Sequence, residues 1–225
     1  MHNNKEYISE DLKFSKQTIK DMKSNSKKFY KKIKERRSIR EFSSKNFDFN
    51  IIKNAILSAG TAPNGANLQP WHFVVVKNKL LKKKIRIAAE KEERLFYKSK
   101  APKEWLDALL PLGTDQNKKF IEKAPYLIAI FEKKFSVSKH KKIKNYYVRE
   151  SVGIATGILI TCLHFSGLAM LTHTPSPMTF LNKILKRPNN EKPFLLLIVG
   201  YPMNKTKTPK FAGQKKCLEE ISTIF

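Results

Sequence analysis

Cysteine is scarce in this chain, since only Cys162 and Cys217 occur among its 225 residues. So few cysteines exclude a disulfide-dense secreted scaffold and a zinc site with four cysteine ligands. Long apolar runs are lacking too. The most apolar stretch, residues 152–171, is interrupted by Ser166 and Gly167, whereas a membrane span needs about 20 uninterrupted apolar residues. We therefore interpret this stretch as a buried core helix followed by a short strand.

The N-terminus lacks the apolar segment of a secretory signal, because it begins Met-His-Asn-Asn-Lys-Glu. We therefore expect a cytoplasmic protein without a membrane partner. Acidic residues are few as well. The chain has 19 Asp and Glu against 45 Lys and Arg, which gives a formal net charge of +26.

The excess of positive charge has two interpretations. A nucleic-acid-binding protein needs such charge, but lysines spread over solvated faces give the same count. The basic residues form short scattered runs without the fingerprint of a zinc finger, a basic zipper or an RNA-recognition sheet. We therefore expect no nucleic-acid partner. A nucleic-acid-binding protein is kept as a separate hypothesis, which a colourless protein that binds DNA would support.

The length and a hydrophobic content of 41% suit one domain with a sizeable core. Residues 1–30 are polar and lysine-rich, and we interpret them as a basic N-terminal arm or a peripheral helix before a domain over residues 31–225. Apolar periodicity predicts an α/β or α+β protein with a sheet of four or five strands. The predicted helices cover residues 51–59, 80–97, 148–165 and 180–185, and the predicted strands cover residues 71–76, 125–131, 168–172 and 194–199.

Residues 98–118 show no clear periodicity, although they contain Trp105, Leu109 and Leu110. A segment of this length and composition inside a compact domain is usually functional or mobile. We therefore predict a lid over a site, at about residues 90–120.

The first candidate site is the basic segment around Ser38. In an extended chain Arg36, Ser38 and Arg40 share one face, because side chains alternate along a strand. Two guanidinium groups and a hydroxyl on one face suit a phosphate. The alternative is a solvated basic turn.

The second candidate site is the loop at residues 61–70, which leads into the predicted strand at residues 71–76. Gly65 permits close approach of a planar ligand to the backbone, and Asn64, Asn67 and Gln69 supply hydrogen-bond donors and acceptors. The alternative is an ordinary turn between a helix and a strand.

Together these segments resemble a known family. Arg-Arg-Ser-x-Arg at residues 36–40, followed by Ala-Pro-x-Gly-x-x-x-x-Pro-Trp-x-Phe-Val-Val-Val at residues 62–76, resembles the FMN-dependent nitroreductase superfamily, in particular its iodotyrosine deiodinase branch. The resemblance runs from about residue 31 to residue 221. It implies an α+β fold with a mixed sheet flanked by helices, and a homodimer with FMN at the interface.

The resemblance also implies roles for individual residues. It assigns the FMN phosphate and ribityl chain to Arg36, Arg37, Ser38 and Arg40, with Lys215 as a further phosphate contact. It places Pro63, Asn64 and Gly65 beside the flavin ring, and the backbone N–H of Ala66 on the substrate phenolate. The segment near flavin N5 is Thr172, His173 and Thr174, of which Thr174 is the expected catalytic hydroxyl donor that favours one-electron chemistry over hydride transfer.

The deiodinase branch is distinguished by a clamp for the amino-acid end of its substrate. Glu93 and Tyr97 have the matching spacing and share a helix face, and Lys118 stands at the matching place before Ala124-Pro125. A zwitterion needs an anion for its ammonium and a cation for its carboxylate, which Glu93 and Lys118 provide. The alternative is that Glu93 is one of several surface charges.

The expected function is the FMN-dependent reductive dehalogenation of halogenated tyrosines to tyrosine and halide. The electrons would come from an external donor, either NAD(P)H or a reductase, and no metal site is expected. The alternative is a broad-specificity flavin nitroreductase or quinone reductase of the same fold, which would not need the clamp.

Overall fold

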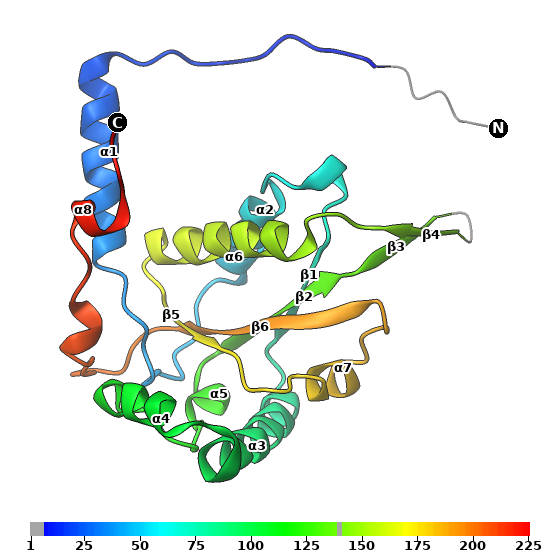
Figure 1. Ribbon diagram of the computed structural model, residues 1–225, viewed down its shortest axis with the longest axis vertical. Coiled ribbons are helices and arrows are strands. Elements are labelled where there is room, and N and C mark those ends of the chain that lie inside the picture. The colour runs from blue at the N-terminus through cyan, green and yellow to red at the C-terminus, as the bar shows by residue number, and fades with distance from the viewer. Residues whose placement is uncertain (1–6, 139–140) are drawn as a thin grey trace. The chain divides into compact units, whose positions relative to one another are not determined.

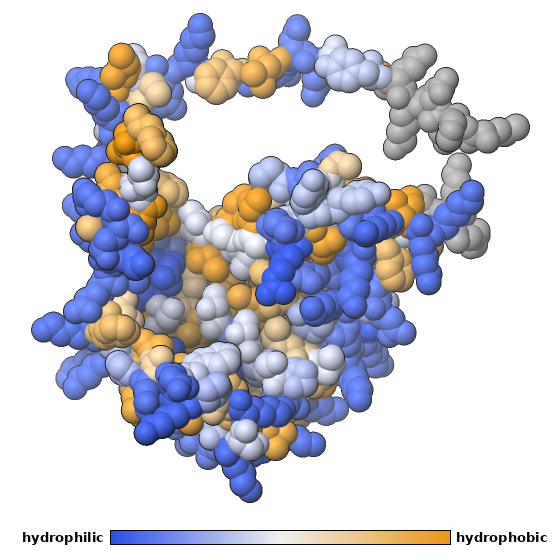
Figure 2. Space-filling view, viewed as in Figure 1, coloured by the Kyte–Doolittle hydropathy of each residue, from blue (hydrophilic) through white to orange (hydrophobic). Residues whose placement is uncertain are grey.

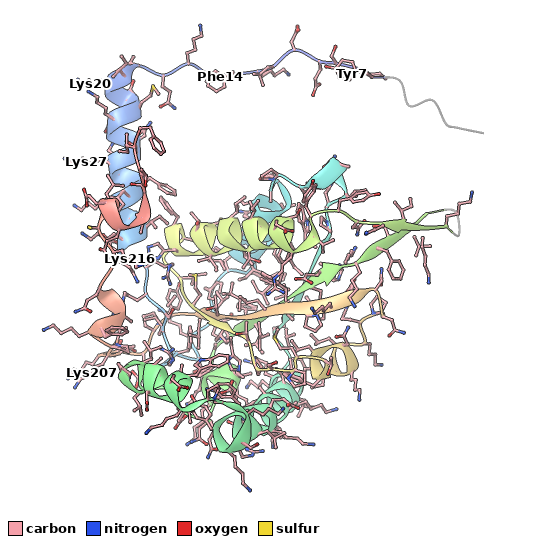
Figure 3. The ribbon with its side chains drawn as sticks, in the orientation of Figure 1. Tyr7, Phe14, Lys20, Lys27, Lys207 and Lys216 are labelled. Atoms are coloured by element: carbon pink, nitrogen blue, oxygen red, sulfur yellow. The ribbon has the colours of Figure 1, made fainter. Side chains whose placement is uncertain are left out.

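The computed structural model describes residues 7–138 and 141–225, and its internal contacts divide the chain into two units, Met1–Glu35 and Arg36–Phe225. The first unit holds one helix, α1 (Ile19–Lys34), after an extended segment. Thr18 begins this helix, because its Oγ1 accepts a hydrogen bond from the Asp21 backbone N–H at 3.1 Å. Lysines such as Lys20 and Lys27 project from α1, while the extended segment exposes Tyr7 and Phe14 (Figure 3).

The second unit is built on an antiparallel four-stranded sheet with the order β1-β2-β6-β5. Its strands are β1 (Trp71–Val76), β2 (Tyr126–Lys133), β5 (Ala169–His173) and β6 (Glu191–Gly200). An isolated parallel bridge from Ser38 to Met170 extends the sheet beyond β5 and makes it mixed. The predicted α+β fold with a four- or five-stranded mixed sheet is therefore confirmed.

Helices cover both faces of the sheet (Figure 1). On β2, Tyr126, Ile128 and Ile130 face the core under α2 and α6, and the alternate residues face the core over α3, α5 and α7. Both faces of this strand are buried, so it lacks the polar alternation of a surface strand. The helices concerned are α2 (Phe49–Gly60), α3 (Lys79–Leu95), α5 (Phe120–Lys123), α6 (Val148–Phe165) and α7 (Phe180–Ile184).

Helix α6 is the one helix of the described chain that is long and apolar enough to cross a membrane, judged by length and composition alone. Here it packs against α2 with Val152, Ala155 and Leu159 fully buried in the core. The interpretation of this stretch as a core helix is confirmed.

Two parts of the second unit contain elements that the sequence did not predict. Residues 98–118 have defined structure: a π-helical turn (Phe96–Lys100), helix α4 (Lys103–Leu109) and a short 3₁₀ helix (Leu110–Leu112). A hairpin of β3 (Phe135–Ser138) and β4 (Lys141–Lys144) had no counterpart in the prediction. The chain closes with a short helix, α8 (Leu218–Ile221).

Lysines and exposed apolar side chains share the surface of the described residues. Figure 2 shows hydrophilic side chains in several separate areas of the face in view, with hydrophobic side chains between them.

Candidate active site

The basic segment lies along the edge of β5. The backbone N–H of Ile39 donates to the Met170 carbonyl at 3.2 Å, and the side chain of Ile39 is buried. The residues on either side of it consequently face a cavity of about 320 Å³. This cavity is lined by Arg36, Arg37, Ser38, Arg40, Leu112, Pro209, Phe211, Ala212, Gln214 and Lys215. The described residues that line it thus include four cations and no carboxylate.

The C-terminal segment holds two of these cations in place. Arg37 Nη2 donates to the Pro209 carbonyl at 2.6 Å, and Lys215 Nζ donates to the Ala212 carbonyl at 3.1 Å. A Cβ on Gly213 would lie 3.0 Å from the Arg37 guanidinium, so glycine lets the chain approach that side chain closely. The structure therefore brings Lys215 to the arginine segment, although the two lie far apart in sequence.

The three predicted clamp residues also meet. Glu93 Oε2 lies 3.1 Å from Lys118 Nζ, and these two side chains are only 13% and 4% exposed. The same ammonium lies 5.8 Å from the centre of the Tyr97 ring. Tyr97 sits in the π-helical turn, a rare element that is frequent at functional sites, and its hydroxyl donates to the Thr114 carbonyl at 3.2 Å.

Residues that sequence reasoning missed fix the position of Lys118. Its Nζ also donates to Thr114 Oγ1 at 3.3 Å and to the Asp115 carbonyl. Its backbone N–H donates to Glu90 Oε1 at 2.8 Å, and Glu90 is in turn paired with Arg86 at 2.7 Å. Glu90 belongs to the acidic run at residues 90–93, which the sequence shows. Only its burial in the structure distinguishes it from Glu92 and Glu93.

Burial and charge shift three titratable groups here. Burial, helped by the cations Lys118 and Arg40, lowers the pKa of His173 to about 3. Burial also lowers the pKa of Arg40 and raises the pKa of the Tyr97 hydroxyl. His173 and Tyr97 are therefore neutral at pH 7, whereas Glu93 and Lys118 form the ion pair of the cluster.

Arg40 connects the two groups of residues. It lines the arginine cavity and also a second cavity of about 420 Å³. The second cavity is lined by Arg40, Gly113, Thr114, Asp115, Asn117, Lys119 and Phe120, residues that surround Lys118 along the chain. A larger hollow of about 630 Å³, lined by residues such as Phe42 and Met203, holds none of the predicted site residues.

At the end of β5 the side chains alternate between exposed and buried. Thr172 and Thr174 are exposed, whereas His173 between them is buried and packs edge-on against Phe120, with ring centroids 5.8 Å apart. The two threonines therefore face away from the buried cluster that contains His173.

The loop at residues 62–69 is held by its own side chains and by the two tyrosines that precede α6. Asn64 Oδ1 accepts from the Gln69 backbone N–H at 2.8 Å, and Asn64 Nδ2 donates to the Ala62 carbonyl at 3.1 Å. A Cβ on Gly65 would lie 2.9 Å from the ring of Tyr147, so this glycine is required by packing. Ala66 has φ of 50°, a left-handed conformation that a non-glycine residue adopts only at a cost.

This loop is the predicted part that the structure does not bring to the others. It enters the sheet at Trp71 on β1, whereas His173 ends β5, and these are the two edge strands. Trp71 lies opposite Glu132, which lies opposite Lys192 on β6. His173 lies opposite Leu196 on the same strand. Three strand spacings and four residues of register therefore separate Trp71 from His173 by about 20 Å.

The fold and the family motifs agree with comparisons against known proteins. The sequence model of the Nitroreductase family matches residues 33–201, and the chain belongs to this family. It is 50% identical over 197 residues to iodotyrosine deiodinase from Haliscomenobacter hydrossis, covering 87% of this chain and 89% of the relative. It is 41% identical over 206 residues to iodotyrosine deiodinase 1 from Rattus norvegicus, covering 89% and 70%.

A solved structure supports the same assignment. The crystal structure of oxidized iodotyrosine deiodinase bound to FMN and 3-iodo-L-tyrosine is 30% identical, with a TM-score of 0.72, and the match covers 87% of this chain and 100% of that chain. The predicted family and its deiodinase branch are thus confirmed.

Proposed function

We propose that this chain is a flavin enzyme that binds FMN and reductively removes the halogen from halogenated tyrosines, giving tyrosine and halide. The observation that carries the proposal is the junction at Arg40. There a cavity suited to a phosphate adjoins a second cavity beside a clamp of one anion and one cation. The names and the bound ligands of the similar deiodinases support the same activity.

The chemistry of the first cavity fits the FMN phosphate. Arg36, Arg37, Arg40 and Lys215 offer charged donors, and Ser38 adds a hydroxyl. The apolar side chains of Leu112 and Phe211 complete the wall. When bound, reduced FMN supplies the electrons that replace a carbon–halogen bond by a carbon–hydrogen bond.

The clamp fits the amino-acid end of a halotyrosine. Glu93 and Lys118 pair with each other at 3.1 Å, and a zwitterion exchanges this pair for two new ones. Its ammonium binds Glu93 and its carboxylate binds Lys118, so both buried charges stay compensated. Tyr97 adds a hydroxyl on the same side. Closure of residues 98–118 then excludes water and orients the substrate ring.

The remaining assigned residues belong to the flavin ring and the phenol. We assign Thr174 as the hydroxyl donor to flavin N5, with exposed Thr172 beside it and His173 contributing through its backbone. Pro63, Asn64 and Gly65 approach the ring, and the Ala66 N–H holds the substrate phenolate. About 20 Å separates the two sheet edges from which these groups come, so a second copy of the chain supplies the loop. The functional unit we propose is therefore a homodimer.

We further propose that the enzyme works in the cytoplasm and takes electrons from NAD(P)H or a reductase. A broad-specificity nitroreductase or quinone reductase of the same fold is the competing function. It differs in needing no pair of opposite charges next to the flavin site.

A spectral titration of the oxidised holoenzyme tests the proposed function. We expect 3-iodo-L-tyrosine to perturb the flavin spectrum with far higher affinity than 2-iodophenol, which has no amino-acid end. Glu93→Gln removes a charged hydrogen bond that is worth about 1.5–3 kcal/mol, so it should weaken iodotyrosine binding by about 10- to 150-fold and leave iodophenol unchanged. Equal losses for both ligands would support the nitroreductase alternative.

A further inference from the structure

One buried polar atom in the cluster has no partner. Among the described residues, His173 Nε2 is the buried side-chain nitrogen or oxygen atom that forms no hydrogen bond. The residue is only 8% exposed. Buried polar groups are almost always paired, so an orphan atom calls for an explanation.

The atom points to Glu93. His173 Nε2 lies 4.0 Å from Glu93 Oε1, beyond hydrogen-bond distance, while the other oxygen of the same carboxylate pairs with Lys118 at 3.1 Å. One oxygen of the Glu93 carboxylate thus pairs with Lys118, while the other lies near the His173 imidazole but too far away for a hydrogen bond. Hydrogen bonds of this kind in active sites often tighten only when a ligand binds.

The charge of the imidazole suits a particular role. Its surroundings are Glu93, Lys118, Arg40 and the ring of Phe120, and burial with the two cations keeps the pKa near 3. A neutral ring with its proton on Nε2 donates a hydrogen bond without cancelling the charge of the carboxylate. An imidazolium would compete with the substrate ammonium for Glu93.

We propose that His173 is a positioning residue for the amino-acid end of the substrate. Its Nε2–H donates to Glu93 Oε1 when Lys118 leaves that carboxylate for the substrate carboxylate. Glu93 Oε2 is then held toward the substrate ammonium. This inference rests on the proposed function, and it makes His173 a determinant of the preference for amino acids over simple phenols.

Two substitutions separate the hydrogen bond from packing. His173→Phe keeps an aromatic ring against Phe120 but removes the donor, and His173→Gln places an amide donor near the position of Nε2. Titrations of each holoenzyme would use 3-iodo-L-tyrosine and 2-iodophenol. We expect His173→Phe to weaken iodotyrosine binding about tenfold and iodophenol binding by less than about twofold, with His173→Gln within about threefold of the wild type.

Other outcomes overturn the inference. They are an equal loss for both ligands in His173→Phe, no loss for either, or failure of His173→Gln to restore iodotyrosine binding. Glu93→Gln is titrated in parallel. If it discriminates between the ligands while His173→Phe does not, only the role of His173 is wrong. If it does not discriminate, the proposed function is wrong and the role of His173 falls with it.

A measurement on the wild-type protein covers the case in which His173→Phe does not fold. Nitrogen NMR of the ¹⁵N-histidine-labelled holoenzyme reports the protonation and tautomer of each imidazole. With 3-iodo-L-tyrosine bound at pH 7, we expect His173 to be neutral with its proton on Nε2. An imidazolium, or a neutral ring protonated on Nδ1, would overturn the inference.

Discussion

At the scale of single residues, the three glutamates near the end of α3 make different contacts. Glu90 accepts from the Lys118 backbone and from Arg86, Glu92 lies 3.8 Å from Lys100, and Glu93 pairs with the Lys118 ammonium. The pair buried most deeply is the one assigned to the substrate. A surface ion pair contributes little to stability, whereas a buried pair resists the removal of one partner.

Arg40 lines both cavities, so its substitution should affect both. We expect Arg40→Ala to release FMN, because the phosphate loses a charged donor in a partly enclosed site. The affinity for FMN should fall by at least about tenfold. Less flavin per chain should then remain after desalting, as measured by absorbance. Arg94→Ala, an exposed arginine of α3, is the control and should retain flavin. Full retention by Arg40→Ala would contradict the assignment of the phosphate site.

At the scale of elements, the sequence predicted those with strong periodicity or clear boundaries. As predicted, β1 covers residues 71–76 and α6 covers residues 148–165, and α2 contains the predicted helix at residues 51–59. The hairpin of β3 and β4 was missed because most of its residues are exposed and polar, so little apolar alternation marks it. The π-helical turn, α4 and the 3₁₀ helix at residues 96–112 were missed because each of them has seven residues or fewer.

Prediction of the site followed the same division. The grouping of the arginines, and that of Glu93 with Lys118, could be predicted because residue type and spacing indicate a shared chemistry. The partners Thr114, Asp115 and Glu90 were not, since long-range contacts place them beside Lys118. The unpaired Nε2 of His173 likewise results from packing, and no local sequence pattern predicts it.

Two glycines offer a matched test of how the loop at residues 62–69 is held in place. A methyl group on Gly65 would meet Tyr147 at 2.9 Å and the Tyr146 carbonyl at 3.1 Å, so Gly65→Ala should destabilise the protein by about 1–3 kcal/mol. Gly153 lies inside α6 with nothing within 4 Å of such a methyl group, so Gly153→Ala should be neutral or stabilise by about 0.5–1 kcal/mol. Chemical denaturation of the two variants measures both. The opposite order would show that the loop does not depend on this contact.

At the scale of the whole molecule, the separation of the predicted site parts is the main feature. The arginine cavity adjoins the cluster of Glu93, Tyr97 and Lys118 through Arg40, while the loop at residues 62–69 enters at the opposite edge of the sheet. A homodimer resolves this separation if each chain completes the site of the other. Each chain would bring its formal charge of +26 to such a dimer, and this charge would make separate dimers repel one another.

A complementation experiment tests the shared site. Arg40→Ala and Ala66→Pro should each inactivate the homodimer, the first at the phosphate and the second because proline removes the loop N–H and cannot adopt the positive φ of Ala66. Co-expression of the two chains yields mixed dimers, in which one site combines the intact arginine of one chain with the intact loop of the other. About a quarter of the wild-type activity should return if pairing is random. If both sites lay within single chains, the mixed preparation would stay as inactive as its parents.

The reaction itself tests the proposed dehalogenase activity. The holoenzyme is reduced under nitrogen, mixed with 3-iodo-L-tyrosine, and followed by flavin absorbance while tyrosine and iodide are quantified. We predict that the flavin is reoxidised and that tyrosine and iodide appear in equal amounts. A reduced flavin that 3-iodo-L-tyrosine leaves unchanged, but that a nitroaromatic compound reoxidises, would contradict the dehalogenase and identify a nitroreductase.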